Sequence, residues 1–268
     1  MKIKKIILNV LLLFIILICI FPFLYMFLMS FRSTMNMHDI RFDMRLLTLE
    51  HYKAIFSNSL FLNAFKNSVF VAISGVVLTE IVSLMAGYAF SRQHFTGKNV
   101  LFKFVVVTML VPGQAILIPL YLVIRGLGWV NTFKALILPL PTAFGVLLMR
   151  QAIESLPKEL IESAQIDGAS EKTILLKIIT PLIHSEMITV AIVTFIGAWN
   201  NFLWPLIVST REEMWTLPLM LTTMQAQDNT DVGLLMACSV ITFLPPFIFY
   251  ISMQSRFKEG IALSGVKG

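Results

Sequence analysis

Long apolar runs separated by short charged segments dominate the chain. Five runs of 21 to 24 residues contain one charged residue between them, Glu80. About 20 helical residues, rising about 1.5 Å each, cross the roughly 30 Å apolar core of a bilayer, so each run predicts a transmembrane helix. The five runs are 6–29, 69–90, 104–124, 187–208 and 232–253.

A sixth apolar run, 135–149, has only 15 residues and is bounded by Lys134 and Arg150. Both long side chains can extend their charges to the membrane interface and lengthen the usable span. We therefore expect a sixth transmembrane helix at about 133–152. The pattern as a whole predicts an all-α membrane protein, with residues 1–268 forming a single domain of six transmembrane helices.

The first run has an alternative interpretation as a signal peptide, because Lys2, Lys4 and Lys5 precede it. It is longer than the apolar region of a typical signal peptide, about 7 to 15 residues, and no small-residue cleavage site follows it. The sequence therefore favours a retained transmembrane helix.

The distribution of Lys and Arg residues predicts the orientation. With six spans, the N-terminus, the 91–103 and 150–185 connections and the C-terminal tail share one side, which holds 13 of these residues against 8 on the other. Cytoplasmic loops of membrane proteins carry the excess of positive charge. Both termini are therefore expected in the cytoplasm.

The composition agrees with a membrane protein. Hydrophobic residues make up 57% and charged residues 13%, against roughly half and about a quarter in soluble domains. So few polar side chains cannot cover a water-facing surface, which excludes an ordinary soluble domain. The net charge of +6 is divided among short clusters, which argues against nucleic-acid binding. Cys19 and Cys238 lie inside apolar runs, so neither a disulfide framework nor a metal site is indicated.

Small residues and prolines occur at membrane depth. In the second run Gly75, Thr79, Ser83 and Gly87 recur at every fourth position, which predicts close approach of another helix in the same bundle or in a partner. Prolines free backbone carbonyls that neighbouring helices or water in a cavity must satisfy, which fits a translocation path, but prolines are common in membrane helices of every function. They occur as Pro112 with Pro119, Pro139 with Pro141, and Pro245 with Pro246.

The connection 155–181 predicts two short helices. Pro157 suits a first helical turn, Gly168 suits the left-handed position after a helix end, and Ser170 suits the cap of a second helix that Pro181 ends. Leu160, together with 161 and 164, predicts the apolar stripe of the first helix. By pattern alone this is a solvated helical hairpin.

The particular residues of this connection carry a resemblance. Glu162-Ser163-Ala164, then Gly168, Ile178 and Pro181, resemble the "EAA" signature of the membrane subunits of bacterial ATP-binding-cassette (ABC) importers. Ser163 and Thr180 depart from it, where the family usually has Ala and Leu. The resemblance implies the type I importer permease fold and a coupling helix that docks on a cytoplasmic ATPase. The ATPase-coupling residues it implies are Glu162, Ser163, Ala164, Asp167, Gly168, Ala169, Ile178 and Pro181.

Further segments look like the carbohydrate branch of these importers. They are 87–92 (GYAFSR), 118–121 (IPLY), 126–132 (GLGWVNT), 199–205 (WNNFLWP) and 264–268 (SGVKG). The resemblance implies import of a sugar or oligosaccharide delivered by an extracytoplasmic solute-binding protein, across a bacterial inner membrane. It implies that the 209–230 connection enters the binding protein's cleft, with Arg211, Glu212, Glu213 and Trp215 as candidate residues. It also assigns the tail, 255–268, to contact with the ATPases.

Catalytic chemistry is not indicated. The chain has no phosphate-binding glycine loop, no zinc-protease motif and no nucleophile elbow, and its four histidines are isolated from one another. Within the resemblance, ATP and magnesium therefore belong to two separate ABC ATPase subunits, and a second permease subunit completes a heterodimer. The chain itself is expected to be a permease subunit without cofactor, catalytic residues or metal.

Candidate residues for the substrate path are Trp199, Asn200, Asn201, Trp204 and Glu80. Aromatic faces and neutral amides bind sugars, whereas Trp at a span end is more often an interface anchor. Glu80 either bonds to a neighbouring helix or lines the pore.

Two other classes remain as alternatives. A channel or ion-coupled secondary transporter would explain Glu80 and the kinked spans but not the 162–181 pattern, and a membrane enzyme lacks a catalytic constellation. The sequence does not name the sugar.

Overall fold

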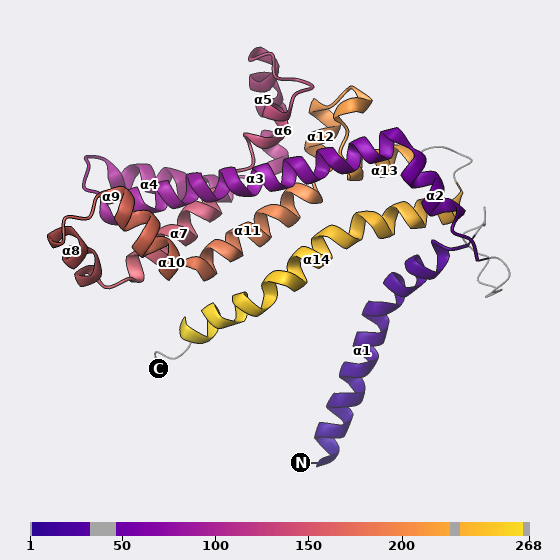
Figure 1. Cartoon of the computed structure of the whole chain (residues 1–268), viewed down its shortest axis with the longest axis horizontal. Helices are drawn as coiled ribbons and strands as arrows, with labels where there is room; N and C mark the ends of the chain where they lie inside the picture. The colour runs from indigo at the N-terminus through magenta and orange to yellow at the C-terminus, as the bar shows by residue number, and fades with distance from the viewer. Residues whose placement is uncertain (1, 33–46, 226–230, 265–268) are drawn as a thin grey trace. The chain divides into compact units, whose positions relative to one another are not determined.

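The computed structural model describes residues 2–32, 47–225 and 231–264, with side chains for 4–32, 47–225 and 231–254. Their secondary structure is helical, apart from an isolated bridge between Arg32 and Leu47, and this confirms the expected all-α class. The helices, labelled in Figure 1, are α1 Lys2–Met29, α2 Glu50–Ser57, α3 Ser59–Arg92, α4 Lys98–Val107, α5 Gly113–Gly126, α6 Phe133–Ile137, α7 Ala143–Ser155, α8 Lys158–Ile166, α9 Glu171–Thr173, α10 Thr180–Leu182, α11 His184–Trp199, α12 Leu203–Val208, α13 Leu217–Gln225 and α14 Val232–Ser264. Two 3-10 turns, Thr108–Leu110 and Glu212–Met214, and a π-helical stretch, Ile174–Ile179, join them.

The contacts divide the chain into two units. Residues 1–65 and 217–245 form the first, and residues 66–216 and 246–268 form the second, so α3 and α14 contribute to both. In the first unit, the rings of Phe23 in α1 and Phe243 in α14 lie 4.9 Å apart. The most apolar stretch of α1 buries none of its residues within the chain. Its apolar side chains are therefore left for lipid or for another subunit.

The second unit contains a cluster of buried side chains around the end of α3 that carries Arg92. Leu84 and Tyr88 of α3 belong to it, together with residues of α7, α8, the π-helical stretch and α11. The buried members are Leu84, Tyr88, Met149, Ala152, Ile153, Ile161, Ala164, Ile174, Ile179, Ile183 and Val190. We call this the α3-end cluster. Figure 1 shows α8, α9 and α10 gathered at this end of α3.

Glycines allow α3 and α7 to approach closely. A Cβ atom on Gly87 would lie 2.7 Å from the Met149 Cβ and 2.9 Å from the Arg150 backbone nitrogen. A Cβ atom on Gly145 would collide with the Ser83 hydroxyl oxygen, and one on Gly75 with the Leu140 side chain. The close helix approach predicted from the small-residue row therefore occurs within this chain.

A second cluster of buried side chains lies nearer the start of α3, around Val71. Val71 of α3 packs there with Ile124 of α5, and the remaining buried members come from α6 and α12: Ala135, Leu136, Trp204 and Val208. Burial of these apolar side chains holds three short helices beside one long one.

Three long helices pass a test of length and hydropathy for crossing a membrane: Lys4–Met29, Ser59–Arg92 and Val232–Gln254. They coincide with the first, second and sixth expected spans. Two helix pairs pass the test only as bent units, 98–110 with 113–126 at 111° and 171–182 with 184–199 at 80°. Among the described residues the structure therefore has three to five such helices, against the six expected.

The other three expected spans are each interrupted. The 104–124 span breaks at Val111 and Pro112, the 133–152 span at 138–142, and the 187–208 span at 200–202. At the first two breaks, Pro112, Pro139 and Pro141 lack the backbone N–H that a continuing helix needs. Hydropathy measures the length of an apolar run and does not register such breaks.

We predict that Gly87→Ala destabilises the chain by about 1 to 3 kcal/mol, because the added methyl group must displace the α7 backbone. Gly197→Ala is the matched control, since Gly197 lies in α11 and no atom lies within 4 Å of the position that an added methyl group would take. Thermal unfolding of the purified chain in detergent measures both. Equal melting temperatures for the two variants would contradict the close α3–α7 contact.

Candidate functional site

The 155–181 segment forms a helix, a turn and a second helix. Pro157 precedes α8, and α8 ends at a turn in which Gly168 has φ +78°, a left-handed conformation that favours glycine. The Ala169 N–H donates to the Ala164 carbonyl at 2.9 Å and closes the helix end. Nothing lies within 4 Å of a Cβ placed on Gly168, so the backbone conformation alone selects glycine there.

The second helix begins as predicted and continues beyond the predicted end. The Ser170 hydroxyl accepts the Thr173 N–H at 3.3 Å. Pro181 does not end the helix, because α10 continues to Leu182 before the bend into α11. The Thr180 hydroxyl donates to the Leu175 carbonyl at 2.7 Å, five residues back in the π-helical stretch. The hydroxyl at this departure from the family pattern thus adds a second donor to a carbonyl that also accepts the Thr180 backbone N–H.

The two faces of α8 differ. Ile161 and Ala164 face the α3-end cluster, whereas Leu160, expected in the same stripe, is 44% exposed. Ile166 is 86% exposed, the largest exposed fraction of any large apolar side chain with a described environment. Of the coupling residues expected from the sequence, Ala164 is buried, Ala169 and Ile178 are partly buried, and the rest are exposed: Glu162, Ser163, Asp167, Gly168 and Pro181. The segment thus presents an exposed surface that includes an apolar side chain.

Ile166 was missed by the sequence reasoning. The available signal was an apolar residue at the end of a short helix, outside the expected stripe of Leu160, Ile161 and Ala164.

The 209–216 loop holds the residues proposed to enter a binding protein. Arg211, Glu212 and Glu213 are exposed, and Trp215 is partly buried with its indole N–H donating to the Ser209 carbonyl at 3.2 Å. Residues 226–230 of the expected 209–230 connection lie outside the described residues, as do residues 265–268 of the tail.

Two asparagines hold this loop: Asn131, which lies in the 126–132 segment of the family resemblance, and Asn67, which the sequence did not indicate. Asn131 has φ +59°. Its side chain donates to the Thr210 hydroxyl at 2.8 Å and accepts the Arg211 N–H at 3.0 Å. The Asn67 amide donates to the carbonyls of Glu213 and Trp215 at 2.8 and 2.9 Å. Asn tolerates positive φ and often bonds to neighbouring backbone. Here, however, Arg211 lies 80 residues from Asn131 in sequence, and Glu213 lies 146 residues from Asn67.

The substrate-path candidates have different environments. Trp199 is 1% exposed and stacks on Phe195 with ring centroids 5.7 Å apart. Trp204 is 5% exposed, and its indole N–H donates to the Ala135 carbonyl at 2.8 Å. The Asn201 side-chain oxygen accepts the backbone N–H of Trp204 at 3.3 Å, and Asn200 is exposed. Trp204 and Asn201 therefore have structural contacts, and Asn200 is the candidate with the most accessible surface.

Glu80 lies in the middle of α3. Both carboxylate oxygens are shielded from solvent, and neither has a hydrogen-bond partner within the part of the chain that the structure describes. The same holds for the hydroxyl groups of its neighbours Thr79 and Ser83. The neighbouring-helix hydrogen bond expected of a structural Glu80 is therefore not made by the described residues of this chain.

Within the described ranges, no three His, Cys, Asp or Glu side chains are grouped closely enough to hold a metal ion.

Comparison with known proteins decides the family. Residues 80–261 match the family described as the binding-protein-dependent transport system inner membrane component. The chain belongs to this family. The permease is 39% identical to the arabinooligosaccharides transport system permease protein AraQ of Halalkalibacterium halodurans, over 95% of its own length and 94% of that protein. It is 32% identical to the trehalose/maltose transport system permease protein MalG of Thermococcus litoralis, over 99% and 98%.

A solved structure gives the same result. The permease superimposes with a TM-score of 0.85 and 25% identity on a chain of a bacterial ABC transporter involved in the import of the acidic polysaccharide alginate, covering 96% of this chain and 97% of the other. The resemblance to ABC importer permeases and the type I permease fold are thereby confirmed. The permease is an inner-membrane component of an ABC importer, and the channel, secondary-transporter and enzyme alternatives are set aside.

We predict that Asn131→Ala loosens the 209–216 loop, because it removes both side-chain hydrogen bonds and the residue that suits positive φ. Each lost hydrogen bond is worth about 1 kcal/mol, so trypsin cleavage after the exposed Arg211 should accelerate about fivefold or more. Asn99→Ala, an exposed asparagine in α4, is the control. Unchanged cleavage would show that Asn131 does not hold the loop.

We predict that Glu80→Leu does not lower the melting temperature of the isolated permease, because no described residue donates to Glu80. A charged side chain at mid-membrane costs roughly 2.5 to 3.5 kcal/mol, so Leu should be neutral or stabilising. Glu80→Gln keeps the shape and tests for a donor outside the chain, through co-purification of other subunits and through transport. A clear drop in melting temperature for Glu80→Leu alone would reveal a donor within this chain.

Proposed function

We propose that this permease imports a sugar or oligosaccharide together with a second permease subunit, two cytoplasmic ABC ATPase subunits and an extracytoplasmic solute-binding protein. The proposal rests on one observation: α8 packs its inner face on the ends of α3 and α7 and leaves Ile166 and its polar neighbours exposed. Such a segment suits docking on a separate protein that moves it.

The relatives support the sugar substrate. Their names assign them arabinooligosaccharides and trehalose/maltose, and the structural neighbour takes part in importing alginate. A second solved structure, of a bacterial alginate ABC transporter with a pentasaccharide-bound periplasmic protein, shares the fold at a TM-score of 0.63 and 15% identity. We infer a carbohydrate for this permease and delivery of that carbohydrate by a binding protein.

The two ends of the second unit take different roles in this proposal. The 155–181 segment lies on the cytoplasmic side, in agreement with the Lys and Arg distribution, and meets an ATPase. The 209–216 loop, with Arg211, Glu212, Glu213 and Trp215, meets the binding protein. ATP and magnesium bind to the ATPases, which close on ATP and move α8.

Reconstitution tests the function. Proteoliposomes that contain the full complex should take up a labelled arabinooligosaccharide or maltodextrin only when ATP is inside and the binding protein outside. Complexes without the ATPase subunits should take up none. Uptake that persists without ATPase or ATP would contradict the proposal.

We predict that Ile166→Glu weakens attachment of the ATPase. Burial of an isoleucine side chain contributes about 2 kcal/mol, so its loss should reduce ATPase affinity about thirtyfold. Gln165→Glu adds the same charge at the adjacent exposed position and serves as the control. Co-purification of the ATPase through a tag on the permease measures both. Equal ATPase recovery from Ile166→Glu and the parent would remove Ile166 from the docking surface.

A further inference from the structure

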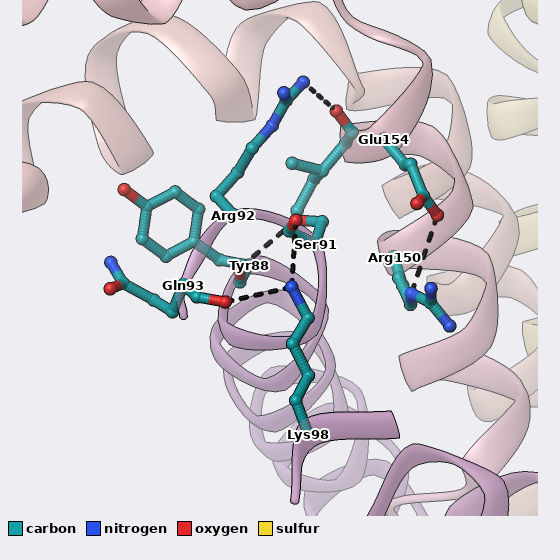
Figure 2. A network of polar contacts seen from close by, with 8 residues as sticks. Tyr88, Ser91, Arg92, Gln93, Lys98, Arg150 and Glu154 are labelled. Carbon is teal, nitrogen blue, oxygen red and sulfur yellow. Dashed lines mark hydrogen bonds and ion pairs between the residues drawn. The ribbon is translucent and has the colours of Figure 1, made fainter. Parts of the chain in front are cut away.

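The end of α3 contacts the 155–181 segment through charged and polar side chains as well as through apolar packing. Arg92, the last residue of α3, has a guanidinium group directed at the end of α7 (Figure 2). Its Nη2 atom donates to the Ile153 carbonyl at 2.6 Å and to the Leu156 carbonyl at 2.7 Å. The last carbonyls of a helix have no partner within the helix, and a cation there also favours the helix dipole. Arg92 therefore caps α7 from another helix.

Leu156, one of the two residues that Arg92 bonds to, lies in the joint between α7 and α8. Leu156 follows α7, and Pro157 separates it from the first residue of α8. The Arg92 guanidinium thus holds both the last turn of a membrane helix and the joint from which α8 departs. Proline lacks an N–H and cannot extend the α7 hydrogen-bond ladder across this joint. The joint is held instead by a side chain from α3.

The next residue contacts the other half of the segment. The Gln93 side-chain amide donates to the Glu171 carboxylate at 2.8 Å, and Glu171 is the first residue of α9. The Lys98 ammonium donates to the carbonyls of Ser91 and Gln93 at 3.2 and 2.9 Å and holds the end of α3 (Figure 2). Two successive residues at the end of α3 therefore bind both halves of the 155–181 segment.

A second arginine nearby has different contacts. Arg150 lies on α7, pairs with Glu154 at 3.5 Å on its own helix, and stacks over the Phe102 ring at 3.8 Å. No hydrogen bond connects it to the 155–181 backbone among the described residues. Arg150 carries the same charge in the same region as Arg92. Replacing Arg150 therefore tests whether an effect of replacing Arg92 comes from the loss of charge or from the position of the side chain.

We propose that Arg92 is a positioning residue for ATPase coupling: its guanidinium ties α3, the end of α7 and the joint before α8 into one body, so that movement of α8 moves both membrane helices. This rests on the proposed function of the 155–181 segment. Apolar packing against the α3-end cluster opposes separation of the elements but opposes sliding weakly, since it has no direction. Two charge-assisted hydrogen bonds from a planar group supply direction.

The test uses the full importer complex in proteoliposomes, with the permease carrying Arg92→Gln, Arg92→Lys or the control Arg150→Gln. Three measurements are made: co-purification of the ATPase, hydrogen exchange of the peptide 153–167, and transport per ATP hydrolysed. A folding defect lowers ATPase recovery, transport and hydrolysis together. A positioning defect leaves recovery and hydrolysis in place and lowers transport per ATP.

For Arg92→Gln we expect normal ATPase recovery, faster exchange in 153–167, and a drop in transport per ATP of about 10- to 100-fold, the range for lost hydrogen bonds to a charged group. Arg92→Lys should recover part of the loss, because the ammonium group keeps the charge and can donate to the same carbonyls. The recovery should be incomplete, because the ammonium is a compact point charge without the planar geometry of the guanidinium. Arg150→Gln should match the parent. If Arg92→Gln does not fold, Arg92→Lys and Gln93→Ala decide through the same three measurements.

Other outcomes overturn the inference separately from the function. If the Arg92 variants match the parent while Ile166→Glu loses the ATPase, coupling through α8 stands and the role of Arg92 is rejected. If Arg92→Gln and Arg150→Gln are equally impaired, charge in this region and not position is responsible, and the role is again rejected. If both the Arg92 variants and Ile166→Glu match the parent, Ile166 is removed from the docking surface and the role of Arg92 is rejected, while the dependence of uptake on ATP and ATPase decides the proposed function separately.

Discussion

The close approach of α3 to α7 is the contact on which the rest of the second unit depends. At Gly87 and Gly145 no side chain separates the two helices, so the α7 backbone lies directly against α3. This places the end of α7 beside Arg92 and puts Leu84 and Tyr88 in the same buried cluster as Ile161 and Ala164 of α8. The orientation of α8, and therefore which of its faces is exposed, follows from a contact made inside the bundle.

The breaks between helices are held by polar side chains from distant elements. Backbone groups that a broken helix leaves unpaired are costly in a membrane protein, because lipid cannot bond to them. The Trp204 indole satisfies the Ala135 carbonyl in α6, next to the break at 138–142. Outside the breaks, Arg92 bonds to the end of α7 and Asn67 bonds to two carbonyls of the 209–216 loop. Side-chain hydrogen bonds from distant elements therefore fix the positions of the short, interrupted helices.

The relatives share the fold while their names give different sugars. A TM-score of 0.85 at 25% identity shows that the packing is retained when most side chains change. Packing at the α3-end cluster requires small residues at Gly87 and Ala164, and the left-handed backbone requires glycine at Gly168. Residues at accessible positions, such as Asn200 and Arg211, are under no such packing constraint.

The membrane class, the all-α composition, the left-handed turn at Gly168 and the cap at Ser170 could all be predicted from the sequence, because each depends on the local chain: apolar length, positive φ and a side chain three residues from its partner. The family resemblance was predictable for the same reason, since the 162–181 pattern is contiguous. The folded arrangement was needed to show that the 187–208 run is interrupted at 200–202, that Ile166 is exposed while Ile161 is buried, and that Arg92, Asn67 and Asn131 hold segments far from them in sequence. These features depend on which helices contact one another, and the hydropathy of the sequence does not specify those contacts.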